Sequence, residues 1–251
     1  IITIRQFPAH PIEMEQLSAL GAVTAEAAAF LRKLVIAGYN IFISGGTGSG
    51  KTTFLNALSD YIPKDSRIIT VEDNAELQIR GVENLVRLEA RKGNTQGDHE
   101  ITIRDLIRAS LRMRPDRVIV GEVRGEETID MIQAMNNGHD GSLSTGHGNS
   151  PRDMLSRLET MCLMSLDIPI LAVRRQIASG LDIMIHLGRM RDKTRKVLEI
   201  LEILGFEDGE IRTHTLYEFE ETAKNTEKVE GKLVKKGDLI QTRKLERAGL
   251  M

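Results

Sequence analysis

The sequence has no tryptophan, a single cysteine and few aromatic residues. Aromatic side chains make up 4% of the 251 residues, so the core must be built mainly from Ile, Leu, Val and Met. A lone cysteine, Cys162, excludes an internal disulfide and fits a reducing compartment. Cys162 shares one apolar helical face with Met154, Leu155, Leu158 and Met161. That pattern favours a small buried hydrophobe over a reactive thiol.

Long apolar runs and a strong net charge are absent as well. No run approaches the ~18 apolar residues of a membrane span, and the opening IITIRQFPAHP lacks the pattern of a signal peptide. The formal net charge is −2, so overall electrostatics give no sign of a nucleic-acid or membrane partner. We therefore expect a cytoplasmic globular protein. Because the chain opens on strand-like sequence without Met, we also expect a fragment that lacks an upstream domain.

Strand-like and helix-like segments alternate through the first two thirds of the chain. Alternation of this kind is typical of a mostly parallel sheet covered by helices on both faces. After residue 181, strand-like runs follow one another without helices, which predicts an antiparallel extension. Strands are expected at 40–44, 67–72, 84–89, 117–120, 141–145, 182–187, 196–204 and 211–219, and helices at 13–20, 24–37, 51–61, 102–115, before 137, 150–166 and 169–179.

A glycine-rich motif stands between a predicted strand and a predicted helix. Glycines let backbone N–H groups point at phosphate oxygens, and the helix N-terminus adds the positive end of its dipole. In such a loop the lysine reaches the β- and γ-phosphates and the hydroxyl that follows it ligates Mg²⁺. A chance glycine turn does not account for the flanking strand and helix. The motif G-x-x-x-x-G-K-[ST] is formed by Gly45, Gly46, Thr47, Gly48, Ser49, Gly50, Lys51 and Thr52, with Thr53 next to it.

Acidic residues follow two of the predicted strands. RIITVE leads into Glu72, Asp73 and Glu76, and RVIVG leads into Glu122. Hydrolysis of a nucleotide needs a polarised water and a held metal, which carboxylates at neighbouring strand ends can provide. The alternative is that these are surface or capping acids. Gly121 stands where many P-loop enzymes carry the metal-binding Asp of the second nucleotide motif.

Several segments together resemble one family. The chain resembles the secretion ATPases of bacterial type II, type IV pilus and type IV secretion systems, and most of all the Tad/CpaF-type ATPase of Flp pilus assembly. The resemblance extends from residue 2 to about 221. The segments that carry it are GGTGSGKTT (45–53), RIITVEDNAELQI (67–79), LRMRPDRVIVGEVRG (111–125), NNGHDGSLSTGHGNSPRD (136–153) and SRLETM (156–161).

The resemblance implies a fold and a division of the chain. The fold is α/β and RecA-like, a P-loop NTPase whose mostly parallel sheet is flanked by helices, with antiparallel strands added at the C-terminal side. Residues 1–38 would be the end of an N-terminal domain with linker helices, and 39–221 the ATPase domain. Residues 222–251 would be a basic tail, with eight Lys or Arg against four acids. Such a run is usually a solvated face; binding to a membrane surface or nucleic acid is the alternative.

The resemblance also implies residue roles. Glu76 would activate the attacking water, and Glu122 would act on Mg²⁺, through water, together with Thr52. His147 would lie near the γ-phosphate, and Arg5 would reach the phosphates across an interdomain cleft. The family usually writes the histidine motif as T-x-H-A or L-H-A. Here it reads Thr-Gly-His-Gly at 145–148, so we expect a more flexible loop.

Other residues keep two interpretations. His139 is a lesser candidate than His147, and either histidine in a glycine-rich loop can simply bond the backbone. Arg112, Arg114 and Arg124 are candidates for stabilising charge across a subunit boundary, with Arg124 first, or for ordinary ion pairs.

The functional hypothesis is an ATP-hydrolysing motor that uses Mg²⁺ and depends on Lys51. The resemblance implies a homo-hexameric ring, peripheral at the inner face of the cell membrane, acting on inner-membrane platform proteins of a secretion or pilus system. One alternative is a RecA-like nucleic-acid translocase or conjugation ATPase, which the near-neutral charge and scarce aromatics disfavour. The other is a nucleotide-dependent assembly module with little turnover.

Overall fold

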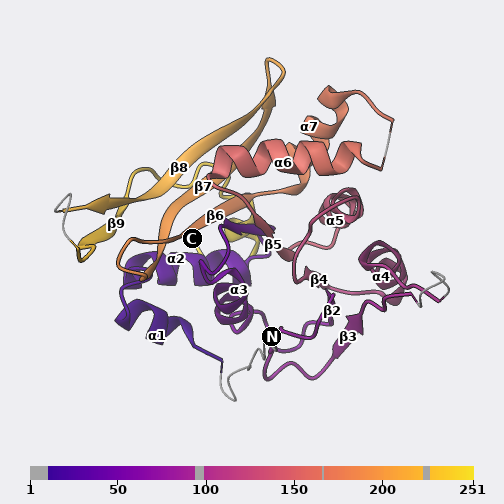
Figure 1. Cartoon of the computed structure of the whole chain (residues 1–251), viewed down its shortest axis with the longest axis horizontal. Coiled ribbons are helices and arrows are strands. Elements are labelled where there is room, and N and C mark those ends of the chain that lie inside the picture. The colour runs from indigo at the N-terminus through magenta and orange to yellow at the C-terminus, as the bar shows by residue number, and fades with distance from the viewer. Residues whose placement is uncertain (1–10, 94–98, 166, 223–226) are drawn as a thin grey trace, which may run out of the picture.

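The computed structural model describes residues 11–93, 99–165, 167–222 and 227–251. In this part of the chain, one nine-stranded sheet has the order β3-β2-β4-β5-β1-β6-β7-β8-β9 (Figure 1). Strands β1 to β6 pair in parallel, and β6 to β9 pair antiparallel. The predicted fold class is therefore confirmed. The strands are β1 (Ile41–Gly45), β2 (Ile68–Glu72), β3 (Leu85–Glu89), β4 (Arg117–Val120), β5 (Leu143–His147), β6 (Ile183–Arg189), β7 (Arg195–Glu207), β8 (Glu210–Glu221) and β9 (Gly231–Lys235).

Helices cover both faces of the parallel part of the sheet, and several begin at the caps that the sequence predicts. The Thr24 hydroxyl accepts the N–H of Ala27, and the Ser150 hydroxyl accepts that of Asp153. Thr102 forms a reciprocal capping box at the start of α4. The helices are α1 (Met14–Ala19), α2 (Ala25–Ile36), α3 (Lys51–Ser59), α4 (Ile103–Ser110), α5 (Glu127–Asn136), α6 (Pro151–Leu163), α7 (Ile170–Gly180) and α8 (Arg243–Arg247), with a 3-10 turn at Leu111–Met113.

Strand β1 separates two hydrophobic cores. Ile41 and Ile43 pack with α1, α2 and α3 on one face, and Phe42 packs with α5, α6 and α7 on the other. All three side chains are fully buried. Because side chains alternate across a strand, a central parallel strand needs apolar residues at every position. This burial fixes the point at which the chain leaves the sheet at Gly45 and enters the glycine-rich loop.

The parallel strands bring their carboxyl ends to one edge of the sheet. Gly45 at the end of β1 pairs with His147 at the end of β5. Strand β2 pairs with β4, so Glu72 ends next to the Gly121 that follows β4. The glycine-rich loop, the acids and the histidine therefore meet at this edge, where open α/β sheets commonly bind ligands.

Strand β5 starts and ends two residues later than predicted. Gly141 has φ +85° and lies in a turn, where its N–H and that of Ser142 donate to Asn40 Oδ1 at 2.9 and 3.0 Å. Gly146, expected in a glycine-rich loop, lies instead inside β5. A Cβ there would come within 2.8 Å of Phe42 Cζ, so close packing requires glycine.

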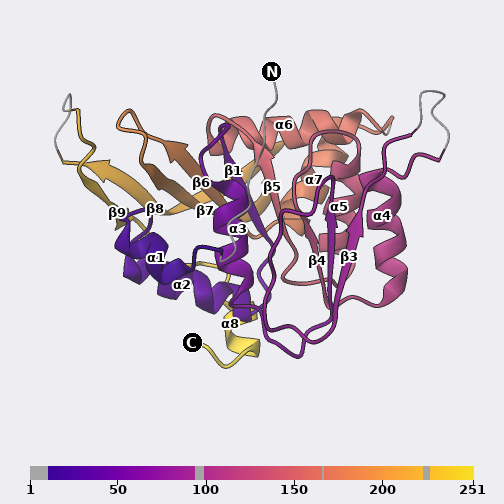
Figure 2. The same ribbon diagram turned by 60° about the horizontal axis from the view of Figure 1, so that its bottom comes forward.

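Residues 222–251 were expected to form only a basic tail, but the part described contains β9 and α8. Strand β9 extends the sheet, and α8 lies close to the C-terminal end of the chain (Figure 2). Leu245 of α8 is buried in the core. Lys244 Nζ lies 2.7 Å from carboxylate oxygens of both Asp140 and Asp182. The Lys244 ammonium therefore helps to hold α8 against the rest of the fold, and it is only partly exposed to solvent. No helix in the described ranges is both long and apolar enough to span a bilayer.

Candidate nucleotide-binding site

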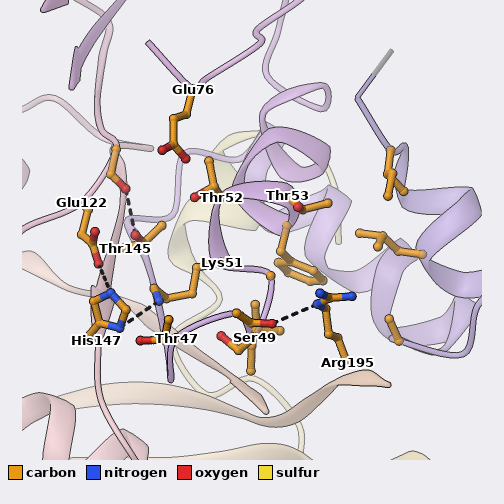
Figure 3. Close-up of a pocket in the computed structure, with 18 of the residues that line it drawn as sticks. Thr47, Ser49, Lys51, Thr52, Thr53, Glu76, Glu122, Thr145, His147 and Arg195 are labelled. Carbon is orange, nitrogen blue, oxygen red and sulfur yellow. Dashed lines mark hydrogen bonds and ion pairs between the residues drawn. The ribbon is translucent and has the colours of Figure 1, made fainter. Parts of the chain in front are cut away.

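A pocket of ≈ 770 Å³ lies at the carboxyl edge of the parallel strands. Most of the residues predicted from the sequence line it (Figure 3). Gly45 and Gly46 lie at the start of the loop and are not part of its wall. Arg5, predicted to reach the phosphates, lies outside the described residues. The predicted residues in the wall are Thr47, Gly48, Ser49, Gly50, Lys51, Thr52, Thr53, Glu76, Glu122 and His147.

The conformation of the loop requires glycine at particular positions. Gly48 has φ +72° and Gly50 has φ +96°, both in the left-handed region that other residues rarely adopt. At Gly45 the limit is space, since a Cβ would lie 2.5 Å from the carbonyl oxygen of Leu187. Helix α3 begins directly after Gly50 without a side-chain cap. Its first N–H groups have no partner within the helix, which makes this end suited to an anion.

Lys51 lies folded against its own loop. The residue is 8% exposed, and Nζ donates to the carbonyl oxygens of Gly45 at 3.2 Å and Gly46 at 3.3 Å. Nζ is also 3.3 Å from Nδ1 of His147. Burial lowers the pKa of Lys51, and the nearby carboxylate of Glu122 opposes that shift. The Lys51 ammonium thus lies at the opening of the loop, where phosphate oxygens can replace the Gly45 and Gly46 carbonyl oxygens as its partners.

His147 connects this lysine to an acid. Its Nε2 lies 2.9 Å from Glu122 Oε1, on the side of the ring opposite Lys51. An ammonium can only donate, so Nδ1 acts as the acceptor and the ring proton is assigned to Nε2, facing Glu122. Burial lowers the pKa of His147, although Glu122 raises it. A neutral His147 imidazole therefore contacts the Lys51 ammonium through one ring nitrogen and the Glu122 carboxylate through the other.

Glu122 is also paired with Arg124. The guanidinium reaches Glu122 Oε2 from Nη2 at 2.6 Å and from Nε at 2.9 Å, and Nη1 lies 3.4 Å from Asp73. The other oxygen of Glu122, Oε1, is buried, and its 2.9 Å contact with His147 Nε2 is not well enough directed to be a hydrogen bond. Arg124 is 64% exposed, so this ion pair is weak and can be exchanged for another partner. The structure places Arg124 beside an acid of its own chain, at the rim of the pocket.

Glu72 was counted among the strand-end acids without a role of its own. It is 5% exposed, and its Oε1 accepts the N–H groups of Glu76 at 3.0 Å and Leu77 at 2.9 Å. Burial raises the pKa of Glu72 to about 7 despite those two bonds. A Cβ on Gly121 would lie 3.0 Å from Glu72 Cγ. Glycine thus stands where many P-loop enzymes have Asp because Glu72 fills that space and holds the segment that carries Glu76.

Three other candidates, His139, Arg112 and Arg114, lie away from the pocket wall, and so does Cys162. His139 precedes β5, with Nδ1 3.1 Å from the carbonyl oxygen of Pro115. Arg112 lies in the 3-10 turn and Arg114 follows it in the left-handed region, at φ 54°. Cys162 is fully buried, as the sequence pattern predicts, and burial raises its pKa to about 12.

Another part of the pocket wall could not be predicted from the sequence. Ile12, Leu17 and Phe54 give it an apolar part, and Arg195 and Lys196 reach it from β7. No motif marks these residues. Arg195 and Lys196 lie far along the chain, in a segment where only strand propensity is visible, so only the tertiary fold brings them to the loop.

The residues of the pocket fit a nucleotide with Mg²⁺. Among the described residues, no group of three His, Cys, Asp or Glu side chains is placed to hold a metal by itself. Mg²⁺ is commonly held by one or two protein groups together with phosphate oxygens. Thr52 and Glu122, whose Oε1 is buried without a well-directed hydrogen bond, supply a hydroxyl and a carboxylate beside the loop. This donor set suits a metal bound jointly by the protein and a triphosphate.

Comparison with known proteins extends this result. PtlH, a type IV secretion system protein of Bordetella pertussis, is 38% identical over 176 residues, covering 68% of this chain and 52% of PtlH. The conjugal transfer protein TrbB of Rhizobium radiobacter is 32% identical over 222 residues, covering 87% and 65%. The VirB11 ATPase of the Brucella suis type IV secretion system, crystallised with sulphate, superposes with a TM-score of 0.64 at 34% identity, covering 74% and 54%.

The chain thus spans about half to two thirds of the length of these relatives. The model of the family described as type II/IV secretion system protein matches residues 1–235. That match includes the loop, both acid-bearing strand ends and the histidine that meet in the pocket, and it confirms the resemblance to the type II/IV secretion family. The chain belongs to the type II/IV secretion system protein family.

Proposed function

We propose that this chain is the ATP-hydrolysing part of a secretion or pilus-assembly machine. The observation that carries the proposal is the pair of contacts that His147 makes with Lys51 and with Glu122 beside the glycine-rich loop. Family membership supports it. So does the 34% identity to VirB11 of Brucella suis, which is described as the ATPase of a type IV secretion system.

In the proposed reaction, the loop amides and Lys51 bind the triphosphate. Lys51 Nζ exchanges the carbonyl oxygens of Gly45 and Gly46 for phosphate oxygens. The Mg²⁺ ion, when bound, neutralises charge on the β- and γ-phosphates, and Thr52 and Glu122 are the residues that would hold it. If Glu122 held the metal, it would give up at least part of its pairing with Arg124, and the freed guanidinium could turn towards the phosphates.

Glu76 is the proposed acceptor for the proton of the attacking water. The backbone N–H of Glu76 is bound to the carboxylate of Glu72, which fixes the loop from which its side chain projects. Figure 3 shows the Glu76 carboxylate directed towards Thr52, on the same side of the pocket as Glu122. Attack of water on the γ-phosphorus yields ADP and phosphate. His147, in contact with both Lys51 and Glu122, would transmit the loss of the γ-phosphate to strand β5.

The proposal extends to the assembly. By analogy with secretion ATPases, we propose a homo-hexameric ring in the cytoplasm, peripheral at the inner membrane face. It would act on inner-membrane platform proteins of a Flp/Tad-type pilus system. Movement of rigid lobes during ATP binding, hydrolysis and release would do the mechanical work.

The test is phosphate release by the purified chain with Mg²⁺ and ATP, next to Lys51→Ala. Loss of the phosphate-binding cation should abolish turnover and weaken ATP binding. Equal rates of phosphate release for wild type and Lys51→Ala would refute the proposed site. Tight ATP binding by the wild type without any turnover would instead favour a nucleotide-dependent assembly module.

A nucleic-acid translocase is the second candidate. The 32% identity to TrbB, described as a conjugal transfer protein, favours it. A nucleic-acid motor generally uses a basic groove and stacking aromatics, whereas this chain has a net charge of −2 and no tryptophan. Stimulation of ATP turnover by single-stranded DNA would support this candidate, and turnover unchanged by DNA would argue for protein export or pilus assembly.

A further inference from the structure

The turn between β6 and β7 brings an arginine to the glycine-rich loop. Arg195, the first residue of β7, donates from Nε to the carbonyl oxygen of Gly48 at 2.9 Å (Figure 3). Its Cδ lies 3.3 Å from the position that a Cβ of Gly50 would occupy. One side chain thus lies against Gly48 and Gly50, whose φ angles of +72° and +96° are in the left-handed region.

This contact restrains one peptide group of the loop at both ends. The carbonyl oxygen of Gly48 is bound by Arg195, and the N–H of Ser49 in the same peptide donates to Gly46 at 3.3 Å. Glycine-rich backbone loses much conformational freedom when it is fixed. A loop that is already fixed before its ligand arrives loses less on binding, and its affinity is higher for that reason.

We propose that Arg195 is a positioning residue that holds the phosphate-binding loop in its anion-binding conformation. The inference rests on the proposed function, because it assumes that the loop binds the triphosphate. Arg195 acts on the loop backbone and through it on phosphate affinity. It takes no part in the chemical step, so kcat should not depend on it.

The same turn offers a matched control. Arg191 lies four residues before Arg195 and pairs with Glu221 at the end of β8, away from the loop. Arg191→Ala removes a guanidinium from the same connection without touching the Gly48 carbonyl. Arg195→Lys is the conservative variant, because an ammonium can still donate one hydrogen bond to that carbonyl.

The experiment measures dissociation constants of the full chain for Mg-ATP and for inorganic triphosphate, with hydrogen–deuterium exchange of the loop amides in protein without nucleotide. Loss of one charge-assisted hydrogen bond should weaken both ligands by the same factor, roughly fivefold to tenfold for Arg195→Ala. Hydrogen–deuterium exchange at the amides of residues 46–50 should be faster in Arg195→Ala than in the wild type. KM for ATP should rise with kcat unchanged, Arg195→Lys should recover part of the affinity, and Arg191→Ala should match the wild type.

Two results would overturn the inference. In one, Arg195→Ala binds both ligands as tightly as the wild type does. In the other, it loses affinity for ATP but not for triphosphate, which would place the action of Arg195 at the nucleoside. A wild-type chain that binds neither ligand would instead refute the proposed function, so the two failures are distinguishable.

Discussion

Replacing Glu72 by Gln should make the protein more stable at neutral pH. The Glu72 carboxylate is almost fully buried, and burial raises its pKa from 4.5 to about 7. A glutamine keeps a carbonyl oxygen that can accept the N–H groups of Glu76 and Leu77, so the segment that carries Glu76 keeps its position. The variant thus removes the cost of a buried charge and retains an acceptor for the two hydrogen bonds.

The size of the effect follows from the pKa. The shift from 4.5 to about 7, at 1.36 kcal/mol per pKa unit, corresponds to about 3 kcal/mol in the free energy of unfolding. Because the folded-state pKa lies above the unfolded one, this stability is present below pH 4.5 and is lost as pH rises through about 7. Of the total, about 2 kcal/mol should be lost between pH 5 and 7. The neutral amide of Glu72→Gln accepts weaker hydrogen bonds than a carboxylate does. This lowers the free energy of unfolding of the variant by the same amount at every pH, so it does not change the pH dependence.

The assay is urea unfolding of wild type and Glu72→Gln at several pH values from 5 to 8. The difference between the two proteins isolates Glu72, since the other titrating groups are common to both. Glu83→Gln, in the exposed segment before β3, controls for the loss of one carboxylate. Parallel stability curves for wild type and Glu72→Gln across this pH range would show that Glu72 is not a buried, charge-penalised group.

Two further substitutions test the site and its support. Glu76→Gln should slow hydrolysis by at least tenfold while ATP binding stays intact, as measured by single-turnover phosphate release and by equilibrium binding; a parallel loss of binding would assign Glu76 to the metal or to the fold. Gly146→Ala should lower stability by about 1–3 kcal/mol, because its Cβ would press on Phe42 at 2.8 Å; an unchanged urea midpoint would mean that the core beneath His147 can adjust.

Much of the architecture was visible in the sequence because it depends on local signals. Apolar strands, capped helices and the glycine loop indicated the element order and its parallel character, and strand ends were expected to converge. The sequence carried a weaker signal for β9 and α8. There, isolated apolar residues such as Leu233 and Leu245 stand among many lysines and arginines, so the composition resembled a solvated tail.

The site was predictable where one motif supplies its own geometry, and not where distant segments meet. Lys51 and Thr52 follow from the loop itself. The contact of Arg195 with Gly48 joins residues 147 positions apart, and no sequence pattern marks it. Likewise, the glycine at 121 looked like a missing acid, and only the packing of Glu72 against it explains the residue.

The central claim is that the triphosphate binds in the glycine-rich loop, between Lys51 and the two acids. A crystal structure of the chain with Mg²⁺ and a non-hydrolysable ATP analogue tests it most directly. The account predicts phosphates against residues 45–52, with Lys51 Nζ on phosphate oxygens instead of the loop carbonyls and with Glu76 and Glu122 facing the γ-phosphate. A triphosphate bound elsewhere, or carboxylates turned away from it, would contradict the account.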